Sequence, residues 1–107
     1  MRWTIVVPVL FMSMVAPRAP RAEGSAPPGV RIESFAFTPA DIRVKAGTAV
    51  EWVNRDEEPH TVTSDDDAFQ SRALETGERF AFTFARKGRF SYHCALHPQM
   101  TGTVVVE

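Results

Sequence analysis

The sequence is poor in cysteine. Cys94 is the only one among 107 residues, so an internal disulfide cannot form. Its thiol is therefore free, bridged to another molecule or bound to a metal. His97 and Met100 follow Cys94 by three and six residues, and an imidazole and a thioether at this close spacing favour the metal.

The sequence also lacks an apolar run of the roughly 20 residues that a membrane-spanning helix needs. The apolar stretch at residues 4–16 is shorter and is interrupted by Pro8. Because it follows the basic Arg2, it is typical of a secretory signal peptide. We expect cleavage after Ala22 or Gly24, export to a bacterial periplasm, and no membrane span in the mature protein.

Three segments are expected: a signal peptide at residues 1–24, a flexible proline-rich tail at 25–29 that does not pair into a sheet, and one domain at 30–107. Removal of the first 24 of 107 residues leaves 83, enough for a single domain. That part has nine Lys and Arg against twelve Asp and Glu, a net charge of −3 with no basic cluster. Nucleic acid is therefore excluded as a partner, since phosphate binding needs clustered Lys and Arg. We expect a monomer.

No stretch has a sustained helical period, and alternation of apolar and polar residues predicts strands instead. The clearest strand is 79–84, where every second residue is phenylalanine, and in 30–37 the alternation puts Phe35 and Phe37 on one face. Residues 68–74 have no clear pattern. Further strands are expected at 42–44, 50–54, 60–63, 90–94 and 101–106. About seven short strands predict an all-β fold, a Greek-key β-sandwich of two packed sheets.

A soft thiolate, an imidazole and a thioether suit copper better than magnesium or calcium, which prefer oxygen ligands. Cys94, His97 and Met100 supply one of each, and His60 upstream supplies a second imidazole. Two histidines and a cysteine in a trigonal plane, with a distant axial methionine, form a blue-copper electron-transfer site. Zinc also accepts thiolate and imidazole ligands, so the sequence leaves that metal as an alternative.

Two further polar residues lie close to these candidates. Neighbouring residues of a strand point to opposite faces, so His93 is expected at the surface or in a hydrogen bond, not at the metal. Asn54 has two interpretations of equal weight. It is either a turn residue that bonds its own backbone, or a clamp that ties the loop of His60 to the loop of Cys94.

Four motifs run along the chain: Phe35-x-Phe37-x-Pro39, Val44-x-x-Gly47-x-x-Val50-x-Trp52-x-Asn54, Pro59-His60-x-Val62 and Gly88-x-Phe90-x-Tyr92-x-Cys94-x-x-His97-Pro98-x-Met100-x-Gly102. Their spacing resembles that of the cupredoxins, and most of all the amicyanins of the plastocyanin group, which have two residues between the ligand histidine and methionine. The resemblance covers nearly the whole mature chain. It implies a small periplasmic protein that binds one copper through His60, Cys94, His97 and Met100 and shuttles single electrons between redox partners as the copper cycles between Cu(I) and Cu(II).

The resemblance also implies transient redox partners, because amicyanins accept electrons from an amine dehydrogenase and pass them to a c-type cytochrome. His97 is the expected electron exit, with its ring edge in an apolar patch. Ala95, Leu96 and Gln99 replace the family's proline-rich and aromatic choices in this loop. With no open coordination position and no acid or base aimed at the metal, we expect no enzyme activity.

Two alternatives use the same residues. A copper carrier or storage protein would hand over the ion itself, and a methionine-rich tail would favour it, but the mature chain has only Met100. An interaction module without metal would lack Cys94 or His97, and both are present. The acidic segments 56–58 and 65–67 are interpreted as solvated loops, with electrostatic steering of a basic cytochrome as the alternative.

Overall fold

The computed structural model describes residues 2–6, 8 and 27–107. Most of the expected signal peptide lies outside the described residues, as do both expected cleavage positions, Ala22 and Gly24. Within the described part of the chain, no helix has the length and apolar character needed to cross a membrane.

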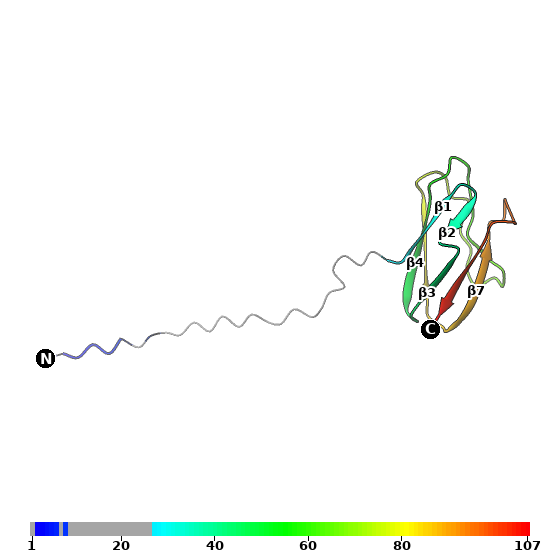
Figure 1. Ribbon diagram of the computed structural model, residues 1–107. Coiled ribbons are helices and arrows are strands. Elements are labelled where there is room, and N and C mark those ends of the chain that lie inside the picture. The colour runs from blue at the N-terminus through cyan, green and yellow to red at the C-terminus, as the bar shows by residue number, and fades with distance from the viewer. Residues whose placement is uncertain (1, 7, 9–26) are drawn as a thin grey trace.

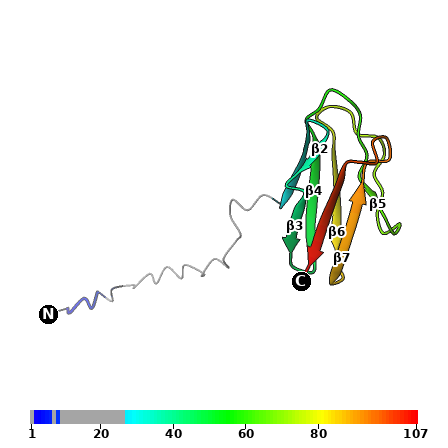
Figure 2. The same ribbon diagram turned by 45° about the vertical axis from the view of Figure 1, so that its right-hand side comes forward.

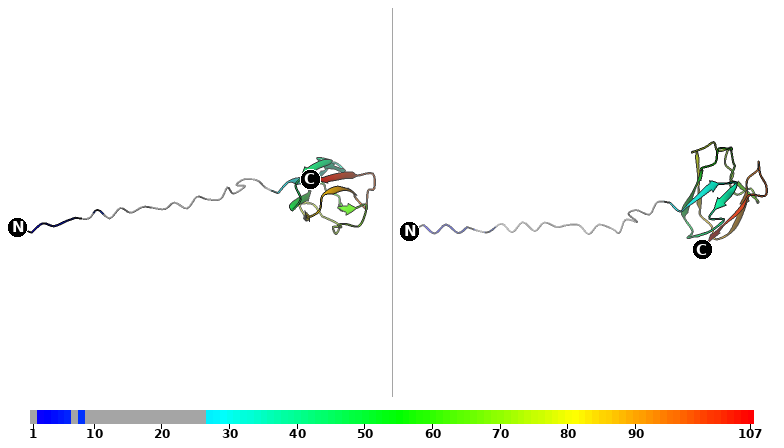
Figure 3. Two further views of the ribbon diagram at one scale, coloured as in Figure 1. Left: turned by 90° about the horizontal axis from the view of Figure 1, so that it is seen from below. Right: turned by 45° about the horizontal axis from the view of Figure 1, so that its top comes forward.

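The described residues contain no helix and eight strands, which form two four-stranded sheets with the orders β2-β1-β4-β6 and β3-β8-β7-β5. The sheets pack on a shared core (Figures 1 and 2), and Figure 3 shows the strands enclosing it in an end-on view. The predicted all-β sandwich is confirmed. The strands are β1 (Gly29–Glu33), β2 (Ala36–Thr38), β3 (Asp41–Val44), β4 (Thr48–Asn54), β5 (Thr63–Ser64), β6 (Arg79–Phe84), β7 (Gly88–His93) and β8 (Thr101–Val106).

Aromatic side chains join the two sheets. Trp52 of β4 and Tyr92 of β7 are fully buried, and their rings meet edge to face with centroids 5.4 Å apart. Phe37 of β2 packs against the same tyrosine at 4.7 Å, and Phe84 is buried as its period-two pattern predicted. Buried aromatic rings each remove ~150–250 Å² from water and dominate the energetics of such a core. Tyr92 is therefore held on several sides, two residues before Cys94.

The strand predicted at 30–37 is wrong, because the chain turns back in its middle. Ser34 and Phe35 adopt left-handed conformations, with φ angles of 53° and 56°, and β1 and β2 pair antiparallel on either side of them. Phe37 is buried, whereas Phe35 is 49% exposed, so the two rings do not share a face. Alternation alone does not distinguish one strand from two strands joined by a two-residue turn.

The predicted tail at 25–29 is also too long. Gly29 is the first residue of β1 and lies opposite Glu51 of β4 in a parallel pair. The carbonyl oxygen of Pro28 accepts a hydrogen bond from the backbone N–H of Glu51 at 3.0 Å. Proline lacks the donor, but its carbonyl oxygen remains an acceptor.

The segment before β6 owes its position to tertiary contacts. A strand was predicted at 60–63, but β5 contains only Thr63 and Ser64. His60 instead exchanges two backbone hydrogen bonds with Leu74, at 3.1 and 2.7 Å. The unpatterned residues 68–74 supply Phe69 and Leu74 to the core. These contacts hold the backbone of His60 in place. His60 is far from Cys94 in the sequence but close to it in space.

Candidate metal centre

The turn from Cys94 to Met100 connects β7 to β8. These strands pair antiparallel as far as His93 and Thr101, so the seven residues between them form a closed turn. Its backbone bonds to itself: Cys94 N–H donates to the Met100 carbonyl at 3.1 Å, and Met100 N–H donates to the His97 carbonyl at 2.9 Å. A turn tied in this way holds its side chains around a small volume.

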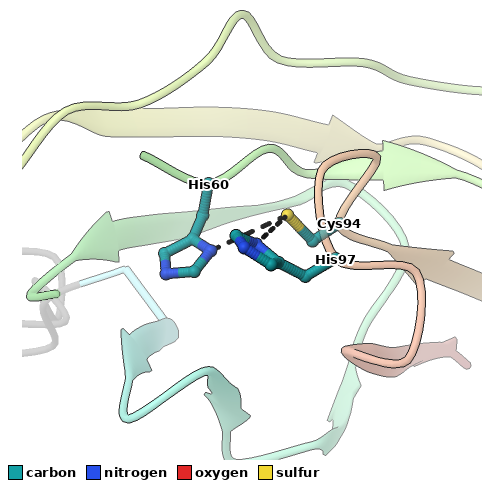
Figure 4. Close-up of side chains that lie close together, drawn as sticks. All are labelled: His60, Cys94 and His97. Carbon is teal, nitrogen blue, oxygen red and sulfur yellow. Dashed lines mark hydrogen bonds between the residues drawn. The ribbon is translucent and has the colours of Figure 1, made fainter. Parts of the chain in front are cut away.

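The structure brings His60, Cys94 and His97 together. The Nδ1 atoms of His60 and His97 lie 3.7 and 3.8 Å from the Cys94 Sγ atom, and the ligand atoms of all three residues are within 4.8 Å of one another. Figure 4 shows both rings directed at the sulfur. His60 and Cys94 are fully buried, while His97 is half-buried.

These separations fit a shared metal ion. Metal–sulfur and metal–nitrogen bonds of about 2.3 and 2.0 Å, lengths typical of zinc, place sulfur ~3.7 Å from each nitrogen when they meet at a trigonal angle of ~120°. The observed distances are 3.7 and 3.8 Å. A buried thiol with two imidazoles is a donor set for a soft or borderline ion such as copper or zinc. The residues present therefore fit the metal that the sequence predicted.

Met100 and His93 take different places around this group. Met100 is 3% exposed at the end of the ligand turn, where the sequence predicted an axial ligand. His93 lies outside the group: its Nδ1 atom is 2.6 Å from the Asp65 Oδ1 atom. The sequence analysis expected His93 at the surface or in a hydrogen bond, and this contact with Asp65 is the second of these.

Asp56 contacts the second ring nitrogen of His60, Nε2. Its Oδ2 atom lies 2.8 Å from His60 Nε2, and its two oxygens accept the backbone N–H groups of Ser34 and Phe35 at 2.7 and 2.9 Å. Burial would raise the pKa of Asp56, but the hydrogen bonds from Phe35, Ser34 and His60 outweigh it and hold that pKa below its usual value. The ionised carboxylate therefore accepts a hydrogen bond from the Nε2–H group of His60, which leaves the Nδ1 lone pair for a metal.

The sequence analysis assigned Asp56 to a solvated loop, and that assignment is wrong, since its side chain is only 14% exposed. One signal could have identified it. Asp56 precedes His60 by four residues, and metal-binding histidines almost always donate their second N–H to a carboxylate, a carbonyl or water. Glu57 and Glu58 are exposed, as expected of the same loop.

Thr61 connects the segment of His60 to the ligand turn. Its backbone N–H donates to Cys94 Sγ at 3.3 Å, and its Oγ1 accepts the N–H of Ala95 at 2.7 Å. The sequence offered Asn54 for this connection as one of two interpretations. Asn54 Nδ2 instead donates to the carbonyls of Glu58 and Leu74, both at 2.8 Å.

The other interpretation of Asn54, a turn residue, is the one that the structure shows. Its Oδ1 accepts the N–H of Asp56 at 2.9 Å, which closes a local turn. Asn54 thus shapes the loop that carries Asp56 and ties it to Leu74. No sequence signal predicts that Thr61 connects the two segments, because a threonine next to a histidine is compatible with any strand or loop.

Phe35 is a further residue that the sequence analysis placed elsewhere. Its ring contacts the imidazoles of both His60 and His97 edge to face, with centroid separations of 5.3 and 5.1 Å. Within residues 27–107, the exposed large hydrophobic side chains are Phe35 and Leu96, 49% and 52% exposed. Phe35 lies against the half-buried imidazole of His97, and Leu96 precedes His97 in the chain, so exposed apolar residues occur next to this imidazole in space and in sequence.

Comparison with known proteins gives a consistent result. The family model described as a cupredoxin-like domain matches residues 4–106. Amicyanin from Paracoccus versutus is 35% identical over 83 residues, which is 73% of this chain and 63% of that protein. The chain thus spans less than two thirds of that relative's length.

Solved structures of cupredoxins have a similar fold. A purple cupredoxin from Nitrosopumilus maritimus superposes with a TM-score of 0.71 at 30% identity, covering 75% of this chain and 99% of that one. A variant of amicyanin in the Cu(I) state gives a TM-score of 0.71 at 30% identity, covering 75% of this chain and 81% of that one.

Proposed function

The chain belongs to the cupredoxin family, and from that membership we propose that it is a periplasmic carrier of single electrons whose one copper ion is bound by His60, Cys94, His97 and Met100. The observation that carries the proposal is the placement of two Nδ1 atoms at 3.7 and 3.8 Å from one buried thiol. When bound, copper supplies a one-electron couple between Cu(I) and Cu(II).

The protein's part is to hold the donors in one arrangement. His60 is fixed at its backbone by Leu74 and at its Nε2 by Asp56. Cys94 Sγ accepts the N–H of Thr61. Because these groups are already placed and hydrogen-bonded, little reorganisation accompanies the gain or loss of an electron, which favours fast transfer.

His97 is the proposed point of electron entry and exit. It is the half-buried member of the group, and Phe35 and Leu96 form an exposed apolar face beside it. A partner that docks there briefly needs only a small interface, under about 1,200 Å². The partners we propose are a c-type cytochrome as acceptor and an amine dehydrogenase or another periplasmic oxidoreductase as donor.

We propose a carrier and not an enzyme. Asp56 is the carboxylate bonded to the ligand group, and it already accepts from Ser34, Phe35 and His60. It is therefore not free to act as a base toward a substrate, and its side chain is only 14% exposed.

The visible absorption spectrum after addition of Cu(II) tests the proposal. The protein should show an intense blue band that ascorbate bleaches. Mixing the bleached Cu(I) protein with an oxidised c-type cytochrome should restore the band as the cytochrome is reduced. Cys94→Ser should abolish the band. His93→Asn is the matched control, because His93 lies next to Cys94 but bonds to Asp65, and it should keep the band. A colourless protein, or a band that survives Cys94→Ser, would overturn the proposal.

A further inference from the structure

The turn formed by Ser34 and Phe35 is held in an unusual conformation beside the candidate metal centre. Both residues have positive φ angles, 53° and 56°, which L-residues other than glycine rarely adopt and bulky ones least of all. Such conformations persist only where the surroundings impose them, and they cluster at functional sites. Here both oxygens of Asp56 bind the turn, one to each backbone N–H.

Asp56 connects this turn directly to a candidate ligand. The Oδ2 atom that accepts the N–H of Phe35 at 2.9 Å also lies 2.8 Å from His60 Nε2. One partly buried carboxylate oxygen therefore contacts both groups, which links the position of the turn to the orientation of the His60 ring.

The side chain of Phe35 lies against both imidazoles. The interplanar angles with His60 and His97 are 90° and 84°, edge-to-face arrangements that contribute beyond simple burial. The two imidazole centroids are 5.1 Å apart, so the three rings form one cluster. His97 lies in the short turn after Cys94 and is only half-buried, which leaves Phe35 as a restraint on its ring.

We propose that Phe35 is a positioning residue for the metal ligands. Its ring restrains the imidazole of His97, and its left-handed backbone, held by Asp56, fixes that ring against His60 as well. The inference deepens the proposed function and rests on it. Without the Phe35 ring, His97 samples other rotamers, and the metal dissociates more readily.

Four variants separate the ring from the backbone. Phe35→Ala and Phe35→Gly both remove the ring, but glycine adopts positive φ without strain, so the glycine variant should be the more stable to urea. Phe35→Tyr keeps the ring. Phe82→Ala is the control, since it also removes a partly buried ring with two ring contacts, here to Phe69 and Phe84, both at 5.0 Å, and none to an imidazole.

The first measurement is the rate at which copper-loaded protein loses Cu(I) to an excess of bathocuproine disulfonate. Alanine and glycine at position 35 should both speed release about tenfold, the effect of losing roughly two edge-to-face contacts. Phe35→Tyr and Phe82→Ala should release copper at the rate of the original protein. The inference is overturned if release follows the order of urea stability, or if Phe82→Ala speeds it equally.

The second measurement needs no metal. Nitrogen-15 NMR of the His97 ring in the metal-free protein should show exchange broadening in the alanine and glycine variants and a single sharp environment with phenylalanine or tyrosine. If the ring signals are the same in all five proteins, Phe35 does not position His97. This result stands even if the original protein binds no copper, so failure of the proposed function is distinguishable from failure of this inference.

Discussion

Replacement of Gly102 by alanine should destabilise the fold strongly. A Cβ atom at this position would lie 2.3 Å from Cζ and 2.4 Å from the hydroxyl oxygen of Tyr92. Ordinary contact begins at 3.4 Å, so the tyrosine ring would have to move by about 1 Å. It has no space to do so, because it is fully buried and packs against Phe37 and Trp52 at 4.7 and 5.4 Å.

The size of the effect follows from the rigidity of this ring. Overpacking a core costs typically about 1–3 kcal/mol and occasionally more, and a clash with a buried ring and the strand behind it belongs at the upper end. We therefore expect the free energy of unfolding to fall by ~3 kcal/mol. Urea denaturation of the metal-free protein is the suitable assay, since a bound metal would add its own stabilisation.

Gly29→Ala is the matched control. Gly29 also lies in a strand, but a Cβ atom there would come no closer than 3.6 Å to the carbonyl oxygen of Glu51. Its unfolding free energy should stay within about 0.5 kcal/mol of the original. In a Tyr92→Leu background, Gly102→Ala should cost less by ~1–3 kcal/mol, because the clashing atoms are gone. An equal cost in both backgrounds, or a cost under about 1 kcal/mol for the single variant, would refute the reasoning.

Two further predictions concern neighbouring groups. Burial raises the pKa of Tyr92 to about 12, against ~10 in the unfolded chain. The contribution of this neutral side chain to the free energy of unfolding is therefore complete below pH ~10 and falls by roughly 3 kcal/mol as the pH rises toward 12. Tyr92→Phe should remove that alkaline decline in urea midpoints measured at pH 9 and 11.5, and an unchanged decline would contradict it. Thr61→Val leaves the Ala95 N–H without its acceptor and should cost ~1 kcal/mol. Thr61→Ser should restore the hydrogen bond, and equal losses in both variants would rule out this role.

The period-two patterns were sufficient to predict most of the sandwich. The inward face of Val50, Trp52 and Asn54 is buried as expected, and β8 has the predicted bounds, Thr101–Val106. Strand patterns are local, and a buried face requires them wherever a sheet has one side against a core. The same local logic failed at Ser34 and Phe35, since nothing in their residue types requires a left-handed turn.

Long-range hydrogen bonds explain that failure. The turn at Ser34 and Phe35 is held by Asp56, more than twenty residues away, and the backbone of His60 is held by Leu74. From the sequence alone, a carboxylate in an acidic loop is expected to be solvated, because the donors that bind it come close only when the chain folds. Asp56 has three such donors, and Thr61 likewise acquires its connection to Cys94 and Ala95 only through the fold.

The sequence alone determined the chemistry and the class of fold. Cys94, His97 and Met100 lie within seven consecutive residues, so their donor types and spacing are evident from the sequence. Strand alternation is likewise evident over a few residues. Tertiary structure alone decided which groups orient these donors. Phe35 reaches both imidazoles from a distant turn, and the backbone N–H groups of that turn hold the carboxylate of Asp56 in place. Such contacts depend on how strands pair and cross, which residue spacing does not encode.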